Sequence, residues 1–257
     1  MGILIAIVAV VIIAAAGALW WRWLTKRQLL WRDRLASHIP VNSKFWREQK
    51  ALPGELLYVA IGDSAAQGIG ASRPEHSYVG MLAKHMRARL AAANDPRMLR
   101  VANLAISGAT VPMAVELELP QLRRLEPDLV TVCIGANDIA NWDEERFRSG
   151  IRAVFDDLPA HAIVADLPSF YFLPGEKKVL VANRIVSEEA AKRGLQLVGL
   201  HALTRRQGLP GIVTQFAGDL FHPNDRGYRV WAKAFEAAVD ERLEALRTRP
   251  AEDHPAG

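Results

Sequence analysis

The sequence predicts a three-layer α/β/α sandwich built on a five-stranded parallel sheet and preceded by one N-terminal transmembrane helix. Beyond about residue 55, short apolar runs alternate with longer amphipathic runs, which is the pattern of repeated strand–helix units. The short runs are apolar throughout instead of alternating with polar residues, as expected for parallel strands that helices cover on both faces. The third observation is an uncharged apolar stretch near the N-terminus.

This N-terminal stretch, from Ile3 to Trp21, has about the length that crosses a bilayer as a helix, roughly 20 residues. Trp20, Trp21 and Trp23 stand where an interfacial aromatic belt is expected. A cleaved signal peptide is the alternative, because residues 16–18 (Ala-Gly-Ala) resemble a cleavage site. No Lys or Arg precedes the run, and the run is long for a signal peptide. Both features favour a retained anchor.

The formal net charge of +4 is unevenly distributed, because basic residues crowd the stretch just after the apolar start. A nucleic-acid partner is not predicted, since no zinc ligands, aromatic RNA-binding signature or helix-turn-helix pattern accompanies them. A membrane-proximal basic collar explains them better. The positive-inside rule then places the folded domain in the cytoplasm, and an extracytoplasmic location is the alternative. The collar consists of Arg22, Lys26, Arg27, Arg32, Arg34, Lys44, Arg47 and Lys50.

At 257 residues the chain can bury one good core and is too short to suggest several domains. We expect an anchor over residues 1–23, a basic juxtamembrane helix and linker over 24–54, one folded domain over 55–247 and a disordered tail over 248–257. The single cysteine, Cys133, excludes an intrachain disulfide. It lies in an apolar run and is expected to be a small buried residue.

Five strands and the helices between them give the predicted sandwich, of the flavodoxin-like type, in which sites form beyond the carboxyl ends of the strands. The expected strands are Leu56–Ile61, Leu99–Asn103, Leu129–Ile134, Ala162–Asp166 and Leu195–Leu200. The expected helices are Tyr78–Ala93, Val111–Leu125, Asp143–Leu158, Lys177–Arg193 and roughly Asn224–Leu246.

The end of the first predicted strand carries Gly62-Asp63-Ser64. The glycine permits a sharp exit from the strand and would leave Ser64 at the edge of the sheet. A serine in this place is by itself more often a turn or helix-cap residue. To become a nucleophile, its hydroxyl needs a base, and the base needs an orienting partner.

Asp219 and His222 stand near the C-terminus, just before the last predicted helix. Their spacing lets a turn bring the carboxylate to one imidazole nitrogen, which fixes the tautomer and leaves the other nitrogen free to accept the serine proton. An exposed loop in which Asp219 caps a turn is the alternative. No metal is expected, because no third ligand has suitable spacing. No cofactor is expected either, since Arg73 replaces the third glycine of the dinucleotide fingerprint that residues 68–70 suggest.

Acyl transfer also needs hydrogen-bond donors aimed at the developing oxyanion. The loops after the second and third strands carry Gly108 and Asn137. The Gly108 backbone N–H and the Asn137 side-chain amide could therefore join the Ser64 N–H at the same edge of the sheet. A turn role is the alternative for each of them alone.

Taken together, these blocks resemble those of the SGNH (GDSL-type) hydrolase family, in the same order along the chain. Residues 62–64 match the nucleophile block, Gly108 the glycine block, residues 135–138 (Gly-Ala-Asn-Asp) the asparagine block and residues 219–223 the Asp-x-x-His block. The resemblance spans about residues 55 to 247. Ala65 departs from the leucine of the family's common name, at a position that packs and does no chemistry.

The resemblance implies a cofactor-free esterase or lipase-like enzyme. It assigns Ser64 as nucleophile, His222 as base, Asp219 as orienting group, and Ser64, Gly108 and Asn137 as oxyanion donors. The expected substrate is a small-molecule, lipid or acylated-sugar ester, with a thioester as a variant. Two alternatives stay open: a carbohydrate O-deacetylase using the same residues, and a non-catalytic membrane-anchored binding module on the same fold. The aromatic residues 170–172 are expected either to line an acyl pocket or to pack a loop.

Overall fold

A parallel sheet of five strands forms the centre of the molecule, in the order β2-β1-β3-β4-β5. This order is that of flavodoxin-like folds, and it confirms the predicted fold class. The computed structural model describes residues 1–248, so most of the predicted tail over 248–257 lies outside the described residues. The strands are β1 (Leu56–Gly62), β2 (Leu99–Asn103), β3 (Leu129–Cys133), β4 (Ile163–Ala165) and β5 (Gln196–Val198).

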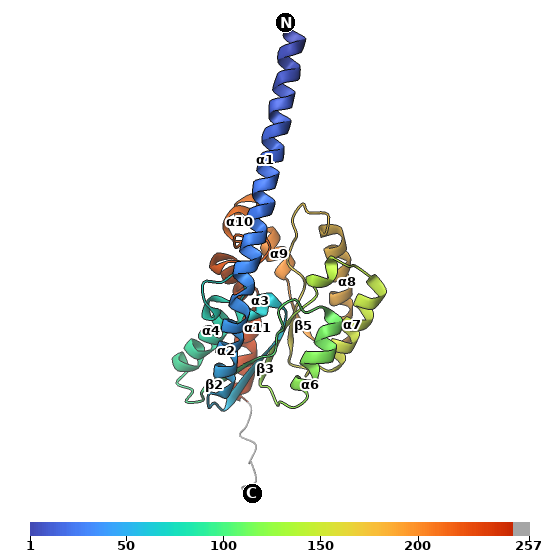
Figure 1. Ribbon diagram of the computed structural model, residues 1–257. Coiled ribbons are helices and arrows are strands. Elements are labelled where there is room, and N and C mark those ends of the chain that lie inside the picture. Colours follow the sequence, from blue (N-terminus) through green and yellow to red (C-terminus); the bar gives the residue numbers. More distant parts are fainter. Residues whose placement is uncertain (249–257) are drawn as a thin grey trace.

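Helices cover both faces of the sheet and complete three layers (Figure 1). One face carries α2 (His38–Ala51), α4 (Tyr78–Ala92) and α11 (Asp225–Thr248). The other carries α5 (Val111–Met113), α6 (Leu119–Leu122), α7 (Glu144–Asp156) and α8 (Glu176–Arg193). The remaining helices are α1 (Gly2–Ala36), α3 (Ser64–Gln67), α9 (Leu200–Arg205) and α10 (Gly208–Thr214), with single turns η1 (Pro74–His76), η2 (Ala114–Glu118) and η3 (Asn137–Ile139).

The central strand β1 shows why its apolar residues do not alternate with polar ones. Tyr58 and Ala60 point into the core beneath α4 and α11, whereas Val59 and Ile61 point into the core beneath α6, α7 and α8. All four residues are fully buried. Since both faces of a parallel sheet are covered, each side chain of the strand is apolar whichever way it points.

Three element predictions differ from the structure. The expected fifth strand ends early, because Gly199 turns the chain and Leu200 begins α9. No helix was expected between the fifth strand and the last helix, yet α9 ends at Arg205 and α10 follows. The helix expected over Val111–Leu125 is interrupted by the π-turn η2. Pro120, just beyond that turn, has no N–H to donate to the preceding turn, which explains the break in the α-helical register.

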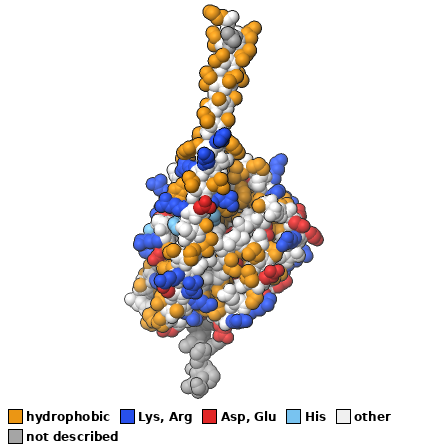
Figure 2. Space-filling view, in the orientation of Figure 1, with side chains coloured by type: hydrophobic (Ala, Val, Ile, Leu, Met, Phe, Trp, Pro, Cys, Tyr) orange, Lys and Arg blue, Asp and Glu red, His pale blue; other side chains and the backbone are white. Residues whose placement is uncertain are grey.

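The N-terminal helix α1 protrudes from the domain (Figure 1). The helical stretch Ile5–Ala51 contains an 18-residue window with a mean hydropathy of 2.1, none of it buried against the protein. It is long and apolar enough to cross a membrane, and a signal sequence near the N-terminus meets the same criteria. Figure 2 shows hydrophobic side chains along the protruding part and Lys and Arg side chains where the helix reaches the domain.

The stretch 24–54, expected as a juxtamembrane helix and linker, continues α1 and then forms α2. Helix α2 is packed against the domain rather than free. Asn42 and Trp46 are buried, and the Asn42 Nδ2 and Trp46 Nε1 groups both donate to the carbonyl oxygen of Gln67, at 3.0 and 3.1 Å. Because Gln67 ends the short helix α3, residues upstream of 55 support the loop that carries Ser64.

Replacing Trp46 by alanine is expected to lower the free energy of unfolding by about 3–5 kcal/mol, the usual cost of removing a buried tryptophan. Urea denaturation of the full chain in a mild detergent measures it. Val41→Ala on the same helix is the matched control, since Val41 is exposed and should change stability by no more than about 0.5 kcal/mol. Equal destabilisation by the two changes would show that α2 is a linker after all.

Candidate active site

Ser64 is placed by the short segment that joins β1 to α3. It is the first residue of α3, and Asp63 caps that helix by accepting a hydrogen bond from the Ala65 N–H at 2.9 Å. At Gly62, any side chain would collide with the carbonyl oxygen of Cys133 on the neighbouring strand. The glycine therefore allows β1 to approach β3 closely at the carboxyl edge of the sheet, where the largely buried Ser64 lines a pocket.

Ser64, His222 and Asp219 form a continuous hydrogen-bonded chain. The Ser64 Oγ lies 2.9 Å from the His222 Nε2, and the His222 Nδ1 lies 2.6 Å from the Asp219 Oδ2. The backbone N–H groups of Phe221 and His222 both donate to the Asp219 Oδ1 at 3.1 Å. Leu220 has a positive φ of 57°, which folds the loop back so that these contacts form. The structure thus joins three side chains that are separated by up to 158 residues in the sequence.

The surroundings of Asp219 favour its ionised form. Burial alone would raise the pKa of this carboxyl group, but the hydrogen bond and charge of His222, together with the two backbone N–H groups, outweigh it and lower the pKa. With Asp219 ionised, the His222 Nδ1 carries a proton that it donates to the carboxylate, and the Nε2 is left as an acceptor for the Ser64 hydroxyl.

The two other predicted donors lie on the loops that follow β2 and β3. Gly108 adopts a φ of +82° in an exposed turn, a conformation that favours glycine. Asn137 begins η3, and its Nδ2 donates to the Ala109 carbonyl oxygen at 2.9 Å. The same nitrogen lies 3.4 Å from the Asp63 Oδ2, beside Ser64. Asn137 therefore connects the loops after β1, β2 and β3 at one edge of the sheet.

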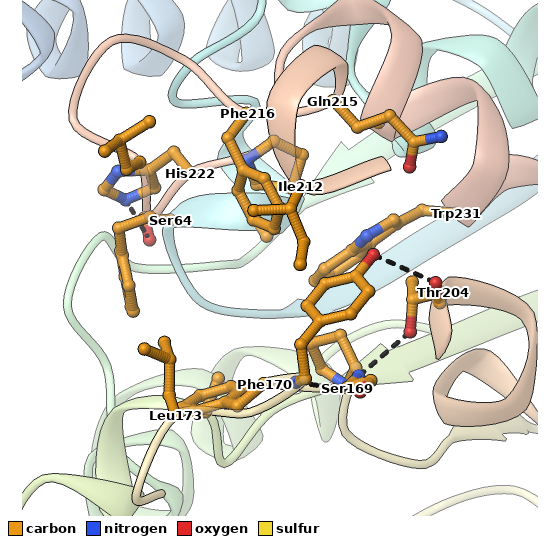
Figure 3. A pocket seen from close by; sticks show the side chains of 18 of the residues that line it. Ser64, Ser169, Phe170, Leu173, Thr204, Ile212, Gln215, Phe216, His222 and Trp231 are labelled. Atoms are coloured by element: carbon orange, nitrogen blue, oxygen red, sulfur yellow. Dashed lines mark hydrogen bonds between the residues drawn. The ribbon is translucent and has the colours of Figure 1, made fainter. Parts of the chain in front are cut away.

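A cavity of about 330 Å³ opens beside Ser64 and His222. Figure 3 shows Ile212, Phe216 and Trp231 around it, with Phe170 and Leu173 opposite. The aromatic residues 170–172 line this pocket, and Phe170 also packs against the core. That the pocket holds an acyl group stays a prediction. The lining residues are Gln28, Asp63, Ser64, Ala65, Ala136, Pro168, Ser169, Phe170, Tyr171, Phe172, Leu173, Thr204, Ile212, Gln215, Phe216, Leu220, Phe221, His222, Pro223, Gly227 and Trp231.

A model of the GDSL-like lipase/acylhydrolase family matches residues 60–230, more than half of the chain. The chain belongs to this family. It is therefore a hydrolase that acts on ester bonds, as the resemblance implied. No curated protein matches the chain.

Solved structures share the acylhydrolase fold. An α/β hydrolase enzyme from the metagenome of Lake Arreo, Spain, is 24% identical with a TM-score of 0.59, over 74% of this chain and 97% of that one. The acetylxylan esterase Axe2 from Geobacillus stearothermophilus is 20% identical with a TM-score of 0.55, over 72% and 94%. The psychrotrophic esterase EstA from Pseudoalteromonas sp., in a structure inhibited by monoethylphosphonate, is 18% identical with a TM-score of 0.55, over 74% and 100%.

Several pocket residues of this acylhydrolase were missed by the sequence analysis. Ile212 lies on α10, which was not predicted, Trp231 lies on the last helix, and Gln28 lies on α1. Helical spacing alone would have assigned Trp231 to the core. Trp142, near Asn137 in the sequence, packs instead against Phe147 with ring centroids 5.1 Å apart.

Glu176 holds the wall of the pocket in place. Its carboxylate accepts hydrogen bonds from the Ser169 Oγ at 3.1 Å and from the Phe170 N–H at 2.6 Å. It also contacts the His201 Nε2 at 2.9 Å and the Arg205 Nη1 at 3.0 Å. Helix α9 thereby fixes the segment that carries the aromatic pocket residues.

Another buried carboxyl group, that of Glu118, lies behind the nucleophile. It is fully buried at the end of η2, and its Oε2 accepts the Gly62 N–H at 2.9 Å. Burial raises the pKa of Glu118 to about 8, although the Gly62 N–H lowers it in part. Burial likewise raises the pKa of Asp63 to about 6, although the hydrogen bond from the Ala65 N–H lowers it in part. Glu118 supports the strand end that presents Ser64.

Glu118→Gln is expected to make the protein less sensitive to alkaline pH. The folded protein keeps the Glu118 proton up to a pKa of about 8, whereas the unfolded chain loses it near 4.5. The contribution of this group to stability is therefore present at low pH and is lost as the pH rises toward 8. Glutamine keeps an acceptor for Gly62 but cannot ionise. Urea denaturation gives the free energy of unfolding of both proteins at pH 5 and pH 8. Between these pH values the difference between variant and wild type should shift in favour of the variant by on the order of 2–4 kcal/mol. A pH-independent difference would contradict this.

Proposed function

We propose that this acylhydrolase cleaves carboxylic esters with an apolar acyl chain through an acyl-enzyme on Ser64, and that α1 is a retained membrane anchor. The observation that carries the proposal is the chain of contacts from Ser64 through His222 to Asp219 at the mouth of an apolar pocket. A nucleophile, a base and an orienting group in contact are the arrangement that activates a serine hydroxyl.

In the proposed reaction, the Ser64 Oγ attacks the ester carbonyl carbon while its proton passes to the His222 Nε2. The carbonyl oxygen becomes an oxyanion, which accepts hydrogen bonds from the Ser64 and Gly108 backbone N–H groups and the Asn137 side-chain amide. The imidazolium, stabilised by Asp219, then gives its proton to the departing alcohol. Water attacks the acyl-enzyme in the same manner, with His222 again as base, and releases the carboxylic acid.

Replacing Asn137 by alanine is expected to lower kcat by a factor of about 10² to 10³, with a smaller change in KM, because an oxyanion donor acts mainly in the transition state. Steady-state kinetics on a soluble ester measure this effect. Asn183→Ala is the control for loss of an asparagine away from the site; the Asn183 side chain binds the backbone of Leu167 behind the pocket wall. If the Asn137 variant lost no more activity than this control, Asn137 would not be an oxyanion donor.

The pocket favours an apolar acyl chain over the acetyl group of a carbohydrate. Phe170, Ile212, Phe216 and Trp231 surround the space next to Ser64 (Figure 3). Sugar hydroxyls would need polar partners, and this wall offers few. A carbohydrate O-deacetylase is the second candidate, because the family fold is shared with the acetylxylan esterase.

A series of p-nitrophenyl esters with acyl chains of 2 to about 12 carbons, together with an acetylated xylo-oligosaccharide, tests the choice. We expect kcat/KM to rise with chain length, by roughly fourfold per added methylene group until the pocket is full. A preference for the acetyl ester and for the acetylated sugar would favour the deacetylase. No turnover of any ester by the folded protein would favour a non-catalytic binding module.

The basic residues that follow the apolar stretch support a cytoplasmic catalytic domain. This part of the proposal rests on the positive-inside rule, and an extracytoplasmic domain is the alternative. Protease added to intact cells should then leave the domain uncut until the cells are lysed. Digestion in intact cells would place it outside.

A further inference from the structure

We propose that the mouth of the Ser64 pocket rests on the same membrane that α1 crosses, so that the enzyme draws its ester substrates directly from the lipid bilayer. This inference rests on the proposed function and adds the source of the substrate. The partner that covers the pocket mouth is the lipid surface itself. Three independent observations support it: the attachment of α1, the position of the pocket along α1, and the apolar rim.

The attachment of α1 fixes how the domain is oriented relative to the membrane. The helix runs without a break from Gly2 to Ala36. Its last turns contact the loop that carries Asp219 and His222. The Trp31 ring lies against Gly218, where a side chain would have no room, directly before Asp219. Leu35 is buried together with Ile69 and Ala217. The same helix therefore crosses the apolar region and packs beside the catalytic carboxylate, so the domain cannot swing freely beneath its anchor.

The position of the pocket along α1 brings its mouth close to the lipid. Gln28 of α1 lines the pocket, only five residues beyond Trp23. At about 1.5 Å per residue, this places the pocket roughly 8 Å along the helix from the tryptophan belt. A bilayer's polar headgroup region is about 5–8 Å thick on each side of the hydrocarbon core. The pocket mouth consequently lies at the depth of the headgroups.

The rim of the pocket is apolar and exposed. Phe172 and Leu173, from one wall, are 73% and 53% exposed, and Leu209 and Val213, on α10, are 71% and 81% exposed. Leu220 and Phe221, beside His222, add to the same rim at 45% and 49%. Figure 1 shows α10 at the end of the domain from which α1 protrudes. Large apolar side chains gathered in this way mark a surface that is removed from water by a partner.

A lipid surface fits this rim better than a protein partner does. The apolar rim and the Lys and Arg residues of α1, from Arg22 to Arg34, lie at the same end of the molecule, and this combination is typical of segments that bind anionic lipid surfaces. An apolar acyl chain could then pass from the bilayer to Ser64 without crossing water. The cost of exposing that chain to water would be avoided for each methylene group.

The environment of residue 213 tests directly whether the pocket mouth contacts the membrane, a contact called here the membrane seating. In Val213→Cys, an environment-sensitive dye is attached to the new cysteine, because the native Cys133 is buried. The full chain is reconstituted into phosphatidylcholine–phosphatidylglycerol vesicles. Met98→Cys is the matched control, since Met98 is exposed just before β2, at the opposite end of the sheet. We expect the emission at position 213 to shift to the blue in vesicles, while the dye at position 98 reports water.

Water-like emission at position 213 would overturn the proposal. A blue shift that vanishes as the protein is diluted in lipid would also overturn it, because a contact between two copies depends on the protein-to-lipid ratio and a lipid contact does not.

Activity on two kinds of ester separates this inference from the proposed function. Leu209→Ser/Val213→Ser changes rim residues that do not line the pocket. We expect this variant to hydrolyse water-soluble p-nitrophenyl butyrate at the wild-type rate, and to hydrolyse p-nitrophenyl palmitate held in vesicles about three- to tenfold more slowly. Equal wild-type and variant rates on both esters would overturn the membrane seating and leave the proposed function standing. Failure of the wild type on both esters would overturn the proposed function, while the dye still reports the seating.

Discussion

Ser64→Ala is expected to lower kcat for ester hydrolysis by a factor of about 10⁵ to 10⁶, because without the Oγ atom no acyl-enzyme can form. His222→Ala should cost nearly as much, and the double variant little more, since the two side chains act as one unit. Steady-state kinetics on p-nitrophenyl butyrate, with the full chain in detergent, measure these losses. Circular dichroism of each variant confirms that the fold is retained.

Ser72 provides a matched control, because it belongs to a second Ser–His–Asp group. The Ser72 Oγ lies 2.9 Å from the His76 Nδ1 and 2.7 Å from the Asp225 Oδ2. The His76 Nε2 accepts the Arg73 Nε–H at 3.0 Å, so the ring proton is on the Nδ1, which lies 2.9 Å from the Asp225 Oδ2 and donates to it. Neither imidazole nitrogen is then left to take a proton from Ser72. Ser72→Ala should therefore keep kcat within about threefold. Similar losses in the Ser64 and Ser72 variants would contradict the assignment of the nucleophile.

Asp219→Asn is expected to lower kcat by a factor of about 10⁴ while the protein stays folded. Asparagine offers an N–H group where the carboxylate accepted one, so the His222 ring changes tautomer and its Nε2 can no longer take the Ser64 proton. The loss should be smaller at high pH, where deprotonation of Ser64 depends less on the base. The pH dependence of kcat/KM measures both effects.

The control for this change is Asp240→Asn. Asp240 also pairs with a histidine, His85, at 2.7 Å, but this pair lies on the surface between α4 and α11. Its loss should leave kcat unchanged. An Asp219→Asn variant that retained more than a tenth of the wild-type kcat would show that the carboxylate does not orient the base.

The sequence predicted the first three strands and the helix over Tyr78–Ala93 to within about a residue. Their patterns are strong because helices cover both faces of the sheet, so the side chains of these strands are mostly buried. The peripheral elements were less predictable. Gly208, Pro210 and Gly211 are typical of a turn, yet they lie in α10, whose Ile212 faces the pocket. Tertiary packing outweighs weak helix propensity there.

The candidate site was predictable because its polar residues all follow strands or precede the last helix. The long-range contacts that support the site could not be predicted. The hydrogen bond from the Gly62 N–H to Glu118 spans 56 residues of the sequence. It depends on the π-turn η2, which the sequence pattern did not predict. The contact of Trp31 with Gly218 joins the N-terminal helix to the catalytic loop, although an aromatic residue among basic ones indicates only a membrane interface.

Covalent labelling of the full chain by a fluorophosphonate tests the central claim most directly. The probe phosphonylates only a serine that a neighbouring base has activated, and mass spectrometry identifies the modified peptide. We expect one adduct, on Ser64, that is absent from the Ser64→Ala and His222→Ala variants and present in Ser72→Ala. A folded wild-type protein that stays unlabelled, or that carries its adduct on another residue, would contradict the account.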